Sequence, residues 1–242
     1  MFTDTTILII TFASFIAAYV NAVFATGGYF IILAISTWVM PMTTALPLQP
    51  AFIYTSLIAR VAYFWRHTNW HIVLTFCLGA LIGVFTGART FVTLSEAILN
   101  LAVGSMMLFI TWLPPIGYRP KFKYPYIPVG IIHGFLTTAI GGSAILQTIM
   151  MRTTLLKRQV TGTLASCFIA MEAMRIIGYA SVGFDYGNYL PMIFMASLAG
   201  LLGTLVGKHT EHLISEKGFR IIFKWLMTFV ALRLIYRGWL LF

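Results

Sequence analysis

Long apolar runs alternate with short polar stretches along the whole chain, and this pattern predicts membrane-crossing helices. The runs cover residues 7–40, 46–65, 72–88, 97–113, 127–151, 160–182, 189–207 and 219–242. Each is close to or longer than the roughly 20 apolar residues that a helix needs to cross a hydrocarbon core. The pattern therefore predicts an all-α polytopic integral membrane protein with about eight hydrophobic helical segments.

Two of these runs are interrupted by adjacent glycines at matching positions. Gly27-Gly28 break the first run, and Gly141-Gly142 break the fifth run 114 residues later. The register continues without gaps, because Ala25-x-Gly27-Gly28-x-x-Ile31 returns as Ala139-x-Gly141-Gly142-x-x-Ile145. Glycine costs about 1 kcal/mol relative to Ala inside a helix, so a pair of glycines marks an interruption. We infer a duplicated unit of four segments whose first segment is broken.

A second internal match comes from the later part of each unit. Leu81-x-Gly83-x-x-x-Gly87 followed by Ser95-Glu96 returns as Leu201-x-Gly203-x-x-x-Gly207 followed by Ser215-Glu216. We interpret the spaced glycines as points of close helix packing and the Ser-Glu pairs as helix-start caps. The chain then divides into repeat one (1–113), a Pro- and Lys-rich linker (114–126) and repeat two (127–242), which together form one integrated transmembrane domain.

The basic character of the chain has a topological explanation. The formal net charge is +10, but only 9% of the residues are charged, and Lys and Arg cluster in short loops. Basic loops orient a membrane protein, so we expect the lipid bilayer and no nucleic acid as a partner. The chain contains no H-E-x-x-H, Gly-x-Ser-x-Gly or P-loop motif. We therefore expect neither an enzyme nor ATP-driven transport, and no cofactor or metal site.

Loop charge also bears on whether the two broken segments cross the membrane. If all eight segments cross, the twelve loop cations divide five against seven; if both broken segments are re-entrant, only Arg89 and Arg237 leave the majority side. The positive-inside rule favours the second arrangement, in which the two repeats are inverted. Against it, the 19 residues from Ile7 to Ala25 are long enough to cross without help.

Each glycine break is a candidate binding site. Backbone groups freed at membrane depth are tolerated only inside protein or against a watery cavity. The half-helix that follows Gly28 or Gly142 would direct amides and a positive dipole end at an anion. The alternative is that each glycine pair only permits tight packing.

Four sequence stretches resemble the TauE/SafE family of anion exporters, which has a duplicated four-segment unit with a Gly-rich interruption in the first segment of each half. The resemblance covers nearly the whole chain. It lies in Thr26-Gly27-Gly28, Gly141-Gly142-Ser143, Thr44-Ala45-Leu46-Pro47-Leu48-Gln49 and Gln159-Val160-Thr161-Gly162-Thr163. Repeat one departs from the family's pattern, because Pro47 and Gln49 stand where repeat two has Thr161 and Thr163.

This resemblance implies a secondary transporter in the cytoplasmic (inner) membrane that moves small anions by alternating access. Sulfite, sulfonates and related organic anions are the implied substrates, with a proton as a candidate coupling ion. Hydrogen-bond donors near the breaks would bind the oxyanion beside the backbone amides, although each is also a common helix cap. The donors are Thr26, Thr44, Gln49, Ser143, Thr161 and Thr163. The alternative is a non-transporting membrane subunit or assembly factor, and the oligomeric state stays open.

Ionisable residues inside the apolar runs complete the candidate set. Glu172 and Arg175 share a helix face and can pair. The alternatives are a coupling carboxylate and an anion-attracting guanidinium. Arg60 lies in the equivalent helix of repeat one, where it can face the anion or extend to the membrane interface. His133 precedes the second break by eight residues, as either a hydrogen-bonded core residue or a protonation site.

Overall fold

The structure is a computed structural model that describes residues 4–24, 27–112, 125–150, 153–210 and 216–241. These ranges form helices joined by short turns, without a β-strand among them. The α-helices are α1 (Asp4–Phe24), α2 (Gly28–Val39), α3 (Met42–Phe64), α4 (Trp70–Phe91), α5 (Glu96–Trp112), α6 (Tyr126–Ile140), α7 (Ile145–Met150), α8 (Lys157–Ser181), α9 (Leu190–Thr210) and α10 (Glu216–Leu240). Two short 3₁₀-helices, η1 (Trp65–His67) and η2 (Gly187–Tyr189), precede α4 and α9.

Several of these helices suit a bilayer. Four spans are long and apolar enough to cross one: Asp4–Phe24, Trp70–Phe91, Arg158–Ser181 and Gly187–Thr210. Large apolar side chains such as Leu74, Leu78 and Phe229 are more than half exposed on the outside of the bundle, where lipid would cover them. The predicted class, an all-α polytopic membrane protein, is confirmed.

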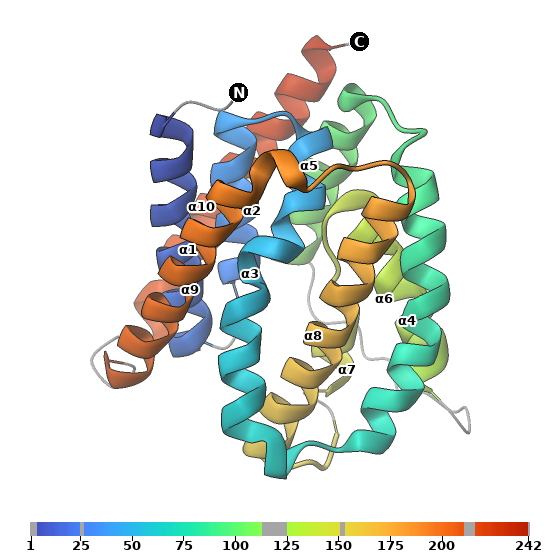
Figure 1. The fold of residues 1–242 in the computed structure, drawn as a ribbon, viewed down its shortest axis with the longest axis vertical. Coiled ribbons are helices and arrows are strands. Elements are labelled where there is room, and N and C mark those ends of the chain that lie inside the picture. Colours follow the sequence, from blue (N-terminus) through green and yellow to red (C-terminus); the bar gives the residue numbers. More distant parts are fainter. Residues whose placement is uncertain (1–3, 25–26, 113–124, 151–152, 211–215, 242) are drawn as a thin grey trace.

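The first glycine break forms a helical hairpin. Gly28 lies directly against the backbone of Ala17, and its amide donates a hydrogen bond to Asn21 Oδ1 at 3.0 Å. The start of α2 therefore packs back onto α1, and α2 returns toward the end of the molecule where α1 begins (Figure 1). With 12 residues, α2 is about 18 Å long, which is too short to cross alone.

The second break forms the matching hairpin. Gly141 ends α6 in a left-handed conformation with φ 73°. The amide of Leu146 then donates to His133 Nδ1 at 3.5 Å, so the six-residue α7 turns back along α6. Both broken segments therefore return to the end from which they enter, as the loop charges favoured.

Corresponding helices of the two halves run in opposite directions. In the α3–α8 pair, Gly162 near the start of α8 faces Phe64 at the end of α3, while Tyr186 after α8 donates to the Pro47 carbonyl early in α3. The α5–α10 pair is also antiparallel, because Gly104 faces Ala231 and Gly238 faces Ala97. The described halves are therefore inverted. The predicted linker falls largely on residues 113–124, which lie outside the described residues.

The spaced glycines lie where helices approach most closely, as predicted. Gly83 and Gly87 of α4 meet the backbone of Ile131 and Phe135 on α6. Their repeat-two counterparts on α9 meet α1, with Gly203 against Phe15. A Cβ at either Gly83 or Gly203 would clash with a carbonyl oxygen, so these positions hold the outer helices against the hairpins.

The turn between α2 and α3 is held by charges from other helices. The Glu96 carboxylate accepts hydrogen bonds from the amides of Met42 (2.7 Å) and Thr43 (3.1 Å) at the start of α3. Arg237 of α10 donates to the Thr37 carbonyl at the end of α2. Each charge complements the helix dipole that it faces. The start of α5 is capped by Ser95, as the Ser-Glu pair predicted, because the Ser95 hydroxyl accepts from the Ile98 amide.

Glu96→Gln is expected to lower stability by about 1 kcal/mol, because it removes a charged acceptor from two helix-start amides. For a chain of this size the thermal unfolding midpoint in detergent would fall by about 2 °C. Asp4→Asn is the control, since Asp4 is an exposed carboxylate in the first turn of its own helix α1 and shares the dipole effect, so that a larger fall for Glu96→Gln reports the two amide hydrogen bonds. Equal midpoints for the two variants would contradict this role of Glu96.

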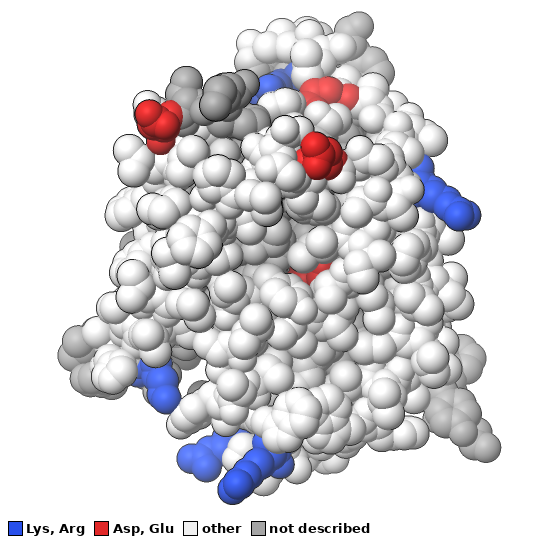
Figure 2. Space-filling model, in the orientation of Figure 1, with Lys and Arg blue, Asp and Glu red and all other residues white. Residues whose placement is uncertain are grey.

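On the face shown in Figure 2, Lys and Arg lie at both ends of the molecule, and the exposed acidic side chains lie near one of these ends. Arg66, Arg158 and Lys208 lie where α3 ends, α8 begins and α9 ends, which is one end of the bundle. Asp4 and Asp185 lie at the opposite end, where α1 begins and where the chain turns from α8 to α9. Arg89 and Arg237 lie at the same end as these aspartates, where α4 and α10 end, and they are the two loop cations expected on the minority side of inverted re-entrant repeats.

Candidate functional site

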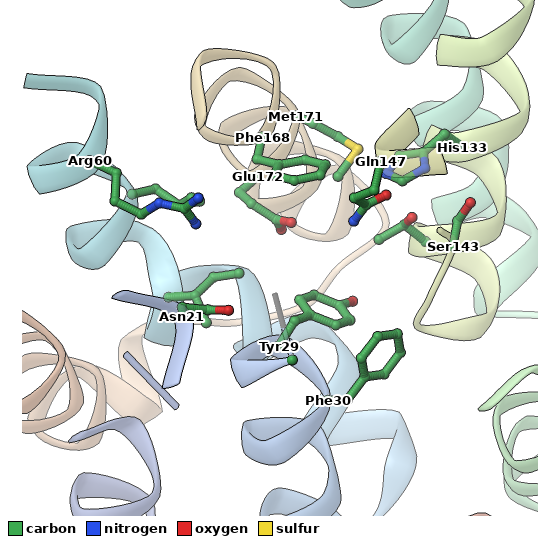
Figure 3. A pocket seen from close by; sticks show the side chains of 14 residues that line it. Asn21, Tyr29, Phe30, Arg60, His133, Ser143, Gln147, Phe168, Met171 and Glu172 are labelled. Carbon is green, nitrogen blue, oxygen red and sulfur yellow. The ribbon is translucent and has the colours of Figure 1, made fainter. Parts of the chain in front are cut away.

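A cavity of about 90 Å³ lies between the two hairpins, in the space that α3 and α8 enclose with them. Both repeats contribute to its wall, so it lies at the meeting point of the inverted halves. The lining residues are Asn21, Gly27, Tyr29, Phe30, Ile53, Leu57, Arg60, His133, Thr137, Ser143, Gln147, Phe168, Met171 and Glu172. In Figure 3 the polar ends of Arg60, Glu172 and Gln147 point toward the same central space.

The two breaks contact each other at this cavity. The Phe30 ring at the start of α2 lies 3.2 Å from the position that a Cβ on Gly142 would occupy. Gly27 and Gly141 both have positive φ values, 101° and 73°, which L side chains rarely adopt. The first glycine of each pair therefore makes the turn, while Gly28 packs against the Ala17 backbone and Gly142 only against the Phe30 ring.

Side chains satisfy several amides at the breaks. Asn21 accepts from Gly28, Ser143 accepts from Ile145 at 3.3 Å, and His133 accepts from Leu146. We expected unpaired amides directed at an anion. The structure differs because a backbone donor buried at membrane depth needs a partner even when no ligand is bound.

Arg60 supplies a positive charge to the cavity. It comes from α3, is partly buried, and points its guanidinium inward rather than along the helix to the interface. Among the residues that the structure describes, no carboxylate forms an ion pair with it. A guanidinium presents a rigid fork of donors suited to the oxygens of an oxyanion.

Glu172 and Arg175 form the predicted ion pair, with Arg175 Nη1 2.7 Å from Glu172 Oε2. Both side chains are almost fully buried. Arg175 packs beside the rings of Tyr29 and Tyr179, while Glu172 lies in the cavity wall. The two guanidinium groups and one carboxylate leave one uncompensated positive charge at the cavity.

His133 is both a core residue and a wall residue. It is 1% exposed, stacks on Phe168 with ring centroids 5.8 Å apart, and lines the cavity. Because Nδ1 accepts the Leu146 amide, the ring proton is on Nε2 and the imidazole is neutral. The hydrogen-bonded role considered from the sequence is therefore confirmed.

Three polar atoms of the wall are buried without a hydrogen-bond partner in the described part of the chain: Tyr29 Oη, Thr137 Oγ1 and Gln147 Oε1. Threonines elsewhere, such as Thr86 and Thr204, bond to a carbonyl one turn earlier. Thr137 does not, although it lies within α6. Unsatisfied buried groups are uncommon, so these three atoms indicate a place for water or a polar ligand.

The family profile described as sulfite exporter TauE/SafE matches residues 10–234, nearly the whole chain. The chain belongs to the TauE/SafE family. As a member of this family, the protein is a multi-pass membrane transporter and not an enzyme. No curated protein and no solved structure matched the chain in the corresponding comparisons.

The cavity of this TauE/SafE protein contains five residues of the predicted site: Gly27, Arg60, His133, Ser143 and Glu172. Gly28, Gly142, Gln49 and Arg175 contact residues of its wall. Gly28 is hydrogen-bonded to Asn21, and Gly142 faces Phe30. Gln49 is fully buried and donates to the Tyr29 carbonyl, Gly141 faces Leu46, and Arg175 pairs with Glu172.

The remaining predicted residues lie elsewhere or were not described. Thr44 is in the first turn of α3, beside the amides that Glu96 caps. Thr161 and Thr163 are in the first turns of α8, and Thr163 Oγ1 accepts from the Asn69 amide at 2.9 Å. None of the three lines the cavity. Thr26 lies outside the described residues.

Sequence reasoning missed Asn21, Tyr29, Thr137 and Gln147, all of which line the cavity of the TauE/SafE protein. A signal existed for three of them. Asn21, Thr137 and Gln147 are polar side chains inside apolar runs, within seven residues of a glycine pair. Buried polar residues in a membrane bundle turn toward the interior, so proximity to the breaks would have favoured them.

Proposed function

We propose that the protein is a secondary transporter that moves small oxyanions, such as sulfite and sulfonates, across the cytoplasmic membrane by alternating access. The main support for this proposal is the position of Arg60. Its guanidinium lies in the cavity where both hairpins meet, and it has no carboxylate partner among the described residues. An uncompensated charge at membrane depth is costly, and a bound anion would neutralise it.

The size and chemistry of the wall support a small oxyanion. One water molecule needs roughly 10 to 15 Å³ of cavity volume. A cavity of about 90 Å³ therefore accommodates a small anion with a few waters. Arg60 would bind one face of the anion through charge-assisted hydrogen bonds. The hydroxyls of Tyr29 and Thr137 would donate to its other oxygens, which would satisfy two of the unpartnered groups.

The inverted hairpins support alternating access. In transporters built this way the substrate binds at the repeat interface, and one half moves against the other to open each side in turn. Since a P-loop is absent from the sequence, an ion or substrate gradient would drive the movement. The end with Arg66, Arg158 and Lys208 would face the cytoplasm.

Counterflow in proteoliposomes tests this function. Liposomes loaded with unlabelled sulfite are expected to take up radiolabelled sulfite faster than unloaded ones, because an alternating carrier returns more quickly when occupied. Protein-free liposomes are the control for leak. A channel would give uptake without stimulation by internal sulfite, and a non-transporting subunit would give no uptake above leak; either result would contradict the proposal.

A further inference from the structure

We propose that the cavity selects singly charged anions, so that hydrogen sulfite and organic sulfonates are carried and dianions such as sulfate are rejected. This selectivity rests on the proposed transport function and adds the charge state of the substrate to it.

The wall carries one net positive charge. Arg60 is unpaired among the described residues, while Arg175 and Glu172 compensate each other at 2.7 Å. His133 is neutral, because its Nδ1 accepts the Leu146 amide. Of the neighbouring tyrosines, Tyr29 is neutral in the wall, and Tyr179 behind it donates its hydroxyl proton to the Thr138 carbonyl.

A single negative charge therefore makes the occupied cavity neutral. A dianion would instead leave one uncompensated negative charge at membrane depth, where burial in a low-dielectric environment penalises any net charge. The Glu172 carboxylate would lie in the same wall and repel the second charge. We expect a dianion to bind about 100-fold more weakly than a monoanion of similar size.

The hydrogen-bonding groups of the wall also favour hydrogen sulfite over the sulfite dianion. Gln147 Oε1 is a buried acceptor without a donor among the described residues, and it lies across the cavity from Arg60. A fully deprotonated oxyanion has only acceptors and would leave this oxygen unsatisfied. A protonated anion brings a donor for Gln147 together with a negative charge for Arg60.

Another arrangement gives the same total charge. A dianion bound while Glu172 carries a proton is electrically equivalent to a monoanion bound beside ionised Glu172. The two differ in what they predict for sulfate. Sulfate stays a dianion across the usable pH range, so it would be accepted at acidic pH only if Glu172 were protonated.

The test is competition against counterflow of radiolabelled methanesulfonate, a permanent monoanion, in proteoliposomes from mildly acidic to mildly alkaline pH. Sulfate is expected to compete about 100-fold more weakly than unlabelled methanesulfonate at every pH. Sulfite is expected to lose potency as rising pH converts hydrogen sulfite into the dianion. Sulfate competing as well as methanesulfonate, at all pH values or at acidic pH alone, would overturn the selectivity. If sulfite, methanesulfonate and the other sulfonates all fail to give counterflow, the proposed function falls and the selectivity falls with it.

Glu172→Gln supplies an independent check on the charge argument. It keeps an acceptor for Arg175 Nη1 but raises the net charge of the wall to two. The potency of sulfate relative to methanesulfonate is expected to rise about tenfold, a ratio that does not depend on how much protein folds. Glu96→Gln, remote from the cavity, is expected to leave the ratio unchanged. An unchanged ratio in Glu172→Gln would overturn the proposal.

Discussion

Gly28→Ala is expected to disrupt the first hairpin, with a loss of about 3 kcal/mol or more in the free energy of unfolding. A Cβ at position 28 would lie within bonding-scale distance of the Ala17 carbonyl oxygen and 2.7 Å from the Asn21 side-chain amide. Both obstacles belong to α1, and the backbone cannot move aside without separating α1 from α2. The substitution would also displace Asn21, which caps Gly28 and lines the cavity.

Gly142→Ala is the matched control for this prediction. The nearest atom to its Cβ would be a ring carbon of Phe30 at 3.2 Å, which belongs to a side chain that can rotate away. Thermal unfolding in detergent should show a midpoint for Gly28→Ala well below wild type, with Gly142→Ala within a few degrees of it. A larger loss for Gly142→Ala than for Gly28→Ala would show that the Gly28–Ala17 contact is not the one that holds the hairpin tightly.

Arg60→Gln is expected to weaken oxyanion transport by about 10- to 100-fold in apparent affinity, the usual size of a charge-assisted hydrogen bond. Glutamine keeps a hydrogen-bond donor on a shorter side chain but removes the charge that makes the cavity positive. Because Arg60 has no ion-pair partner among the described residues, its loss leaves no carboxylate unpaired. The variant is therefore expected to fold normally, which separates its effect from that of Gly28→Ala.

Much of the architecture could be predicted from the sequence, because two of its physical signals are strong. Glycine pairs are costly inside apolar helices, so their return after 114 residues indicated a duplicated, broken segment. Loop Lys and Arg indicated that both broken segments re-enter. The structure agrees, since the starts of α2 and α7 pack back on α1 and α6.

The site could not be predicted from the sequence in the same detail, because it depends on contacts between residues far apart in the chain. Glu96 caps a helix 54 residues away instead of its own. Thr161 and Thr163 follow the second break closely in sequence, yet they begin the 25-residue α8 at the end of the bundle rather than at its centre. Arg60 could be recognised as a candidate, but its direction could not, since a long side chain can point inward or toward the interface.

Sulfite counterflow into proteoliposomes of wild type, Arg60→Gln and Arg89→Gln tests most directly whether the cavity between the hairpins is the transport site. Arg89 is exposed in the last turn of α4, so its replacement removes the same charge away from the cavity. We predict an apparent affinity for sulfite that falls about 10- to 100-fold in Arg60→Gln and stays at the wild-type value in Arg89→Gln. Equal affinities in the three proteins would contradict the account.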